Sequence, residues 1–215
     1  MKDFAESIYL SFQFDRKTMG VTFFVPAFVI SIVLLLILIV PRGTSDSYNN
    51  VILIQGGFIP FSCWWLMYRL SEIYEEGAQE TLAPYYRKSF IVDFLRYYVL
   101  NALGICLLGA VLVMRHGIDT LPLVNFIHFF LLLLFFMWLG TFLIVLVKNI
   151  EIALTIVLIF TVLEVATLGE YMPWPHIFLF EYPVWDPILA NKFTVLSIAI
   201  LVLAIPTITY LKRTG

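Results

Sequence analysis

Six long apolar runs constrain this chain more than any other feature, because each is long enough, or nearly long enough, to cross a bilayer. A helix needs about 20 apolar residues to cross a hydrocarbon layer of about 30 Å. The runs cover roughly 18–40, 51–70, 94–114, 122–147, 152–168 and 193–211. We therefore predict an all-α integral membrane protein with six transmembrane helices, forming a single transmembrane domain over 1–215.

The composition excludes a soluble domain and several kinds of site. Only 13% of the residues are charged and 61% are hydrophobic, whereas soluble domains carry about 25% charged residues. Cys63 and Cys106 both fall inside apolar runs, so the sequence predicts neither a disulfide nor a metal site. The first run is longer than a signal-peptide core and lacks a cleavage site, which predicts a retained helix. The net charge of -2 makes nucleic acid an unexpected partner.

The distribution of lysine and arginine predicts the orientation of the chain. Six spans place both termini on one side, and cytoplasmic flanks are enriched in these two residues. The side away from the termini holds Arg42, Arg115 and Lys192. The terminal side holds the other ten: Lys2, Arg16, Lys17, Arg69, Arg87, Lys88, Arg96, Lys148, Lys212 and Arg213. We expect a multi-pass protein of the cell membrane with both termini in the cytoplasm.

Residues 1–17 predict a helix that lies along the membrane surface before the first span. One side of this helix carries Phe4, Ala5, Ile8, Tyr9 and Phe12. Leu10 and Phe14 lie on the opposite side, so the separation of apolar and polar faces is imperfect.

A polar segment over 71–93 connects the second and third spans. Acidic residues come first and basic residues follow, with interruptions at Gly77 and Pro84. The pattern fits a short helix along the membrane surface, against which a soluble partner could push. It also fits a solvated loop.

The centre of this segment resembles the corresponding part of ABC-2 type permeases. Glu76-Gly77-Ala78-Gln79-Glu80-Thr81-Leu82, followed by Pro84 and Arg87, is similar to that family's pattern of an acidic residue, Gly-Thr-x-Glu-x-Leu, a proline and a basic residue. Ala78 replaces the family's usual threonine. The N-terminal amphipathic helix, the six spans and a long outer segment extend the resemblance over the whole chain.

In that family the segment is a coupling helix that docks on a nucleotide-binding subunit. The resemblance therefore implies ATPase coupling by Glu76, Gly77, Glu80, Leu82, Pro84 and Arg87. It also implies a second permease chain, identical or merely similar, with the transport path between the two membrane domains.

The chain itself has no phosphate-binding loop, because none of its eleven glycines is followed by lysine. We expect this chain to be a transport subunit and no enzyme, with no cofactor of its own. ATP and Mg would bind to a separate ABC ATPase subunit, and lipid surrounds the spans.

The outer segment over 169–192 contains four prolines and many aromatic residues, which excludes a plain helix. Non-helical backbone at membrane depth is tolerated only against protein or a water-filled cavity. A re-entrant hairpin that closes the outer end of a path fits these features, and the resemblance to ABC-2 permeases implies one. The candidate outer gate is Trp174, Phe178, Phe180 and Trp185. The alternative is an aromatic belt at the lipid interface.

Glu164 lies within the fifth span, where a charged side chain costs at least about 2.5 kcal/mol, so we expect it to face protein or to be protonated. It is either a buried functional carboxylate or a structural group near the outer end of its helix. Asn101, Asn125 and His128 could line a polar path or bond helices to one another.

The leading hypothesis from the sequence is the permease subunit of a bacterial ATP-driven exporter. Its aromatic, nearly uncharged spans suit a hydrophobic or amphipathic cargo such as a peptide, an antibiotic or a lipid. The alternatives are a proton-coupled secondary transporter that uses Glu164 and an intramembrane enzyme. The second alternative rests on Glu75-Glu76, which resembles the Glu-Glu pair of CAAX-type proteases.

Overall fold

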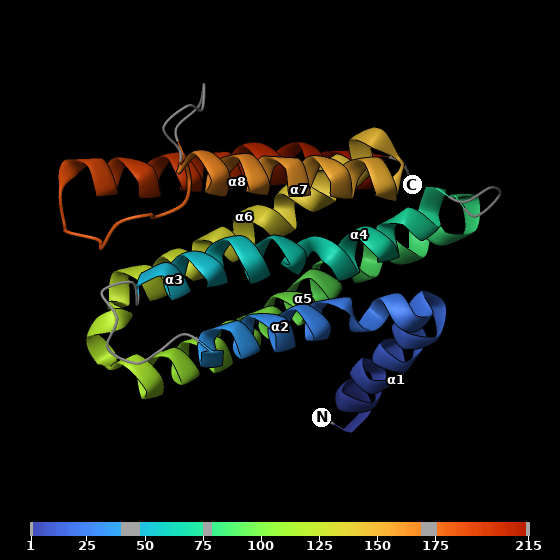
Figure 1. Ribbon diagram of the computed structural model, residues 1–215. Helices are drawn as coiled ribbons and strands as arrows, with labels where there is room; N and C mark the ends of the chain where they lie inside the picture. Colours follow the sequence, from blue (N-terminus) through green and yellow to red (C-terminus); the bar gives the residue numbers. More distant parts are fainter. Residues whose placement is uncertain (1, 40–47, 75–78, 169–175, 214–215) are drawn as a thin grey trace.

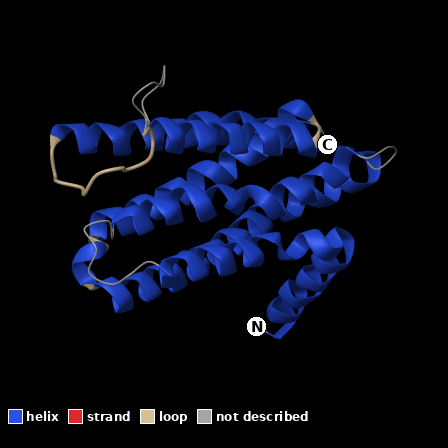
Figure 2. Cartoon of the chain, in the orientation of Figure 1, coloured by secondary structure: helices blue, strands red, loops and turns tan. Residues whose placement is uncertain are grey.

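A computed structural model describes residues 2–39, 48–74, 79–168 and 176–213, and this part of the chain is helical with no strand (Figure 2). Six of its helical stretches are long and apolar enough to cross a membrane. They are Tyr9–Ile39, Asn49–Tyr74, Lys88–His116, Leu123–Val147, Ile150–Thr167 and Pro187–Leu211. The predicted count of six is confirmed, and the chain is a multi-pass membrane protein.

The helix α6 (Leu123–Val147) lies at the centre of the bundle. It packs against α4 (Trp64–Ser71), α5 (Gln79–His116), α7 (Ile150–Thr167) and α8 (Pro187–Arg213). Figure 1 shows α7 and α8 on one side of the bundle, with α2 and α1 on the other. The end of α8, the α1–α2 turn, the end of α4 and the start of α5 lie together at one end, which we call the terminal end (Figure 1).

The first helix changes direction sharply before the first span. α1 (Lys2–Met19) leads through the 3₁₀ turn η1 (Gly20–Phe24) into α2 (Val25–Ile39), and Gly20 takes a positive φ of 57°. Pro26 has no N–H to bond the carbonyl of Thr22. The indole Nε1 of Trp64 donates to this oxygen at 2.8 Å, and α1 therefore leaves the axis of α2 at a fixed turn (Figure 1). The helix predicted over 1–17 is observed as α1.

The second span is an irregular helix. It runs from α3 (Asn49–Leu53) through a π-helical turn, η3 (Ile54–Phe58), and a 3₁₀ turn, η4 (Ile59–Cys63), into α4. Pro60 is the second residue of the 3₁₀ turn and cannot donate a helical hydrogen bond, because proline has no N–H. The widened turn places Gln55 at a buried position, which matters for the site described below.

Two helix boundaries differ from the sequence predictions. α5 is 38 residues long and contains Pro84 near its start, so the break expected at this proline is not observed. α8 begins at Pro187, six residues before the predicted start of the last span at 193. Asp186 caps it, since its Oδ1 accepts the N–H of Leu189 at 2.7 Å, and proline is favoured at the first helical position.

Candidate functional site

Four charged residues meet inside the terminal end of the bundle, and we call them the charge cluster. They are Asp15 of α1, Arg69 of α4, and Asp93 and Arg96 of α5. Asp15 forms ion pairs with both guanidinium groups. Asp93 Oδ2 lies 3.0 Å from Arg69 Nε, and Asp93 Oδ1 lies 3.4 Å from Arg96 Nη2. The four side chains are between 2 and 8% exposed.

The charge cluster is neutral, because two carboxylates face two guanidinium groups. Burial of unpaired charge would cost several kcal/mol per ion, so this balance is what permits the four side chains to be buried. Tyr97 donates its hydroxyl to Asp15, and its ring stacks on Trp65 with centroids 5.4 Å apart. The guanidinium carbon of Arg96 lies 4.5 Å from the centre of the same ring. The cluster thus joins α1, α4 and α5 into one unit.

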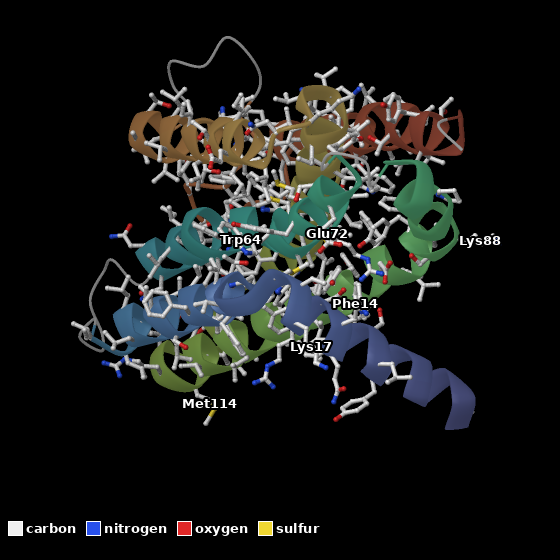
Figure 3. The ribbon with its side chains drawn as sticks, turned by 90° about the vertical axis from the view of Figure 1, so that its right-hand side faces the viewer. Phe14, Lys17, Trp64, Glu72, Lys88 and Met114 are labelled. Atoms are coloured by element: carbon white, nitrogen blue, oxygen red, sulfur yellow. The ribbon has the colours of Figure 1, made fainter. Side chains whose placement is uncertain are left out.

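A second set of contacts ties the charge cluster to the α4–α5 connection. Glu72, at the end of the second span, accepts a hydrogen bond from the hydroxyl of Tyr86 in α5. The guanidinium of Arg69 lies over the ring of Tyr86, 4.9 Å from its centre. Burial, together with the hydrogen bond to Glu72, raises the pKa of Tyr86. Figure 3 looks onto this end, with Glu72 above α1 and Lys88 at the edge of the bundle.

The predicted ATPase-coupling residues sit just beyond these contacts along the chain. Glu76 and Gly77 lie outside the described residues. Glu80, Leu82 and Arg87 belong to the first turns of α5, and their side chains also lie outside the described part of the structure. Pro84 is exposed on α5. Their coupling role stays a prediction.

At the opposite end, a non-helical segment over 176–186, which we call the extended segment, enters the bundle between helices. Its residues Ile177, Phe178 and Leu179 are buried. Gln55 pairs with the backbone of Leu179 at both ends of its amide: its Nε2 donates to the carbonyl at 3.0 Å, and its Oε1 accepts the N–H at 3.0 Å.

The backbone of Ile177 is bonded by two further helices. The N–H of Ile177 donates to Glu164 Oε1 of α7 at 3.3 Å. The Nε2 of His128 in α6 lies 2.8 Å from the Ile177 carbonyl oxygen, as expected for a ring N–H donor. Side chains from three helices therefore supply hydrogen-bond partners to backbone groups that no neighbouring strand bonds.

Three of the four candidate outer-gate residues are described by the structure, and their role stays a prediction. Trp174 lies outside the described residues. Phe178 is fully buried and its ring centroid lies 6.0 Å from that of Phe136, while Phe180 packs 6.1 Å from Phe178. Trp185 is 71% exposed and stacks on Phe193 with a centroid distance of 6.4 Å.

The remaining buried polar candidates bond elements to one another. Asn101 donates to the carbonyl oxygens of Tyr97 and, across to the second span, of Ser62 at 3.3 Å. Asn125 donates to the hydroxyl of Tyr48 at 3.3 Å. Burial raises the pKa of Tyr48 to about 12, although the hydrogen bond from Asn125 opposes the shift. These contacts agree with the helix-bonding interpretation.

The sequence reasoning missed Asp15, Asp93 and Gln55 as site residues. The sequence signal for Asp15 and Asp93 is that each lies beside an apolar run, as Arg69 and Arg96 lie within one. Charged side chains that are buried at such positions are paired with one another. No protein-family model, curated protein or solved structure matches this chain. The fold and the site define a class: a helical membrane protein with a charge cluster at one end. At the other end, an extended segment is held by hydrogen bonds from side chains of three helices.

Proposed function

We propose that this chain is the permease subunit of an ATP-driven ABC exporter of the ABC-2 type. It moves a hydrophobic or amphipathic substrate out of the cytoplasm or the inner leaflet. In this proposal it resides in the cell membrane with both termini in the cytoplasm, pairs with a second permease chain and binds an ABC ATPase. Six spans, the amphipathic α1 and the motif around Glu76 to Leu82 support the assignment.

The contacts around the α4–α5 connection carry the proposal. A segment that transmits force from an ATPase must be attached rigidly to the spans that it moves. The Glu72–Tyr86 hydrogen bond ties the two sides of the connection together, and Arg69 extends this attachment to Asp15 of α1. In the proposed cycle, closure of the ATPase pair displaces the tip of the connection, and the charge cluster makes α1, α4 and α5 follow as a unit.

The extended segment at the opposite end is, in this proposal, part of the re-entrant hairpin that the sequence predicts over 169–192, although residues 187–192 form the start of α8. Its support is the burial of non-helical backbone whose N–H and C=O groups bond to Gln55, His128 and Glu164. Non-helical backbone at membrane depth requires such internal partners. The hairpin then closes the outer end of the path between the two permease chains.

The test is co-purification in detergent with an ATPase whose gene lies beside that of this chain, followed by measurement of ATP turnover. We expect a stable complex from the unaltered chain. The double variant Glu80→Arg with Gly77→Trp adds bulk and positive charge at the coupling segment, and it should abolish both association and stimulated turnover. Asp119→Arg makes the same charge reversal at an exposed residue of the opposite end and should leave both unchanged.

Two results would count against the proposal: no neighbouring ATPase associates, or the double variant couples normally while Asp119→Arg does the same. A proton-coupled secondary transporter is the second candidate, since Glu164 is fully buried in α7. In that case Glu164→Gln would abolish uptake or efflux driven by a proton gradient in vesicles that contain the chain alone.

A further inference from the structure

The end of the bundle away from the termini contains a cavity of about 650 Å³. It lies between the start of α3, the end of α7, the extended segment and the first turn of α8. The acidic and basic residues of the described lining are His176, Glu181, Asp186 and Lys192. A space of this size accommodates a small organic group, because ligand pockets measure about 300 to 1,000 Å³.

An apolar groove of about 500 Å³ continues from this cavity between the second span and α7. The two spaces share Asn49, Ile52 and Leu168 in their walls, so they are adjacent. Gly56 and Gly57 of the π-helical turn line the groove on the side of the second span. Gly56 permits close approach to α7, because a Cβ at this position would lie 2.7 Å from Cγ2 of Val165. Its other wall is formed by Thr161, Val162, Val165 and Ala166.

The charge of the cavity favours a cation. Among the lining residues that the structure describes, Glu181 and Asp186 contribute two negative charges and Lys192 one positive charge, which gives these residues a net charge of -1. His176 adds no positive charge at neutral pH, because burial and the neighbouring Lys192 lower its pKa. Lys192 interacts electrostatically with Glu164 as well as with Glu181 and Asp186, so this lysine faces three acidic groups.

The aromatic lining supports the same choice. Phe180 and Tyr182 both border the cavity, and the Tyr182 ring is 55% exposed. Aromatic faces attract ammonium groups, most strongly where water is partly excluded. An anionic head would instead meet the two carboxylates, and the described part of the lining offers it one lysine.

We propose that the cavity and the groove together form a binding site for a cationic amphiphile, with its ammonium head between Glu181 and Asp186 and its apolar tail along α7. As a statement about cargo, this deepens and rests on the exporter function proposed above. The binding itself does not depend on an ATPase and is measured on the permease chain alone.

The experiment uses the full chain in nanodiscs of zwitterionic lipid, with empty nanodiscs as the blank. The probes are octyltrimethylammonium and octyl sulfate, which share one tail and differ in the sign of the head. Saturable binding is measured by isothermal titration calorimetry below the concentrations at which either probe forms micelles. We expect the cationic probe to bind at least about tenfold more tightly, as expected for one favourable charge pair at a partly exposed site.

Matched variants locate the site. Glu181→Gln with Asp186→Asn removes both negative charges and keeps the cap of α8, because asparagine caps as well as aspartate. This pair should abolish the preference for the cation. Glu151→Gln, an exposed acid at the terminal end, should leave it unchanged. Ala166→Phe fills the groove and should weaken both probes, whereas Ala190→Phe, exposed on α8, should weaken neither.

Equal affinity for the two probes, or a preference for the cation that survives Glu181→Gln with Asp186→Asn, would overturn the proposed site. The exporter proposal fails separately. If the cationic probe binds as expected and no ATPase couples to the chain, only the exporter function is refuted. If ATPase coupling holds and the probes bind equally, only the amphiphile site is refuted.

Discussion

Removal of the Asp15 carboxylate is the most direct test of the charge cluster. In Asp15→Asn, Arg69 and Arg96 each lose an ion pair, and only one of the two oxygens that accept from Arg69, Arg96 and Tyr97 remains. Loss of one partner from a buried ion pair costs about 3 to 5 kcal/mol, because a buried charge is left uncompensated. Asp93 still contacts both guanidinium groups, so we expect the lower end of this range, about 3 kcal/mol.

Thermal unfolding in detergent, followed by tryptophan fluorescence, measures this cost. For a chain of about this length, 1 kcal/mol corresponds to about 2 to 4 °C, so the midpoint should fall by about 6 to 12 °C. Glu151→Gln is the matched control, since it neutralises an exposed acid and should change stability by less than about 0.5 kcal/mol. An Asp15→Asn midpoint equal to that of Glu151→Gln would refute the reasoning.

A double-mutant cycle separates pairing from general disruption. Arg96→Gln alone should also destabilise, but the double variant with Asp15→Asn should cost less than the sum of the two by about 1 to 3 kcal/mol. Strict additivity would mean that the two side chains do not interact in the folded protein.

Three further outcomes follow from the structure. A Cβ at position 140 would overlap Cys63 Cβ and lie 2.8 Å from Met67 Sδ. Gly140→Ala should therefore lower the free energy of unfolding by about 1 to 3 kcal/mol in the same assay. Unchanged stability would show that α6 can shift to make room for the methyl group. Gln55→Leu removes both bonds to Leu179, so hydrogen–deuterium exchange at the Leu179 amide should accelerate at least about tenfold, while exchange of peptides from α5 stays constant. The pKa of His176 is lower in the folded protein than its ordinary value of about 6.5, so the unfolded chain takes up the proton first and stability is lost as the pH falls below that value. His176→Gln should flatten this acid limb, and an identical pH profile in both proteins would contradict the shift.

The sequence predicts the six spans well, because hydrophobic length is a local property of each segment. It also contains a start signal for the last helix, since Asp186-Pro187 combines an N-cap residue with proline at the first helical position. The apolar run alone begins later, and this is why the predicted start at 193 is six residues late.

The charge cluster could not be assembled from the sequence in the same way. Arg69 and Arg96 entered the prediction only as two of the ten cations on the terminal side, whereas in the structure both are buried in ion pairs. Asp15 lies 54 residues from Arg69 along the chain, and no local pattern joins them. Pairing over such separations depends on how helices pack, which a single sequence does not specify.

The extended segment limits how the helices around it can move. Its bonds to Gln55, Glu164 and His128 come from the second, fifth and fourth spans, so a sliding motion of any one of these helices by a single turn would separate a donor from its acceptor. Each such rupture inside the bundle costs about 1 to 3 kcal/mol unless a new partner replaces the old one. A displacement of one helix along the segment therefore breaks or exchanges the attachment of that helix. The segment therefore sets a threshold for helix motion at this end of the protein.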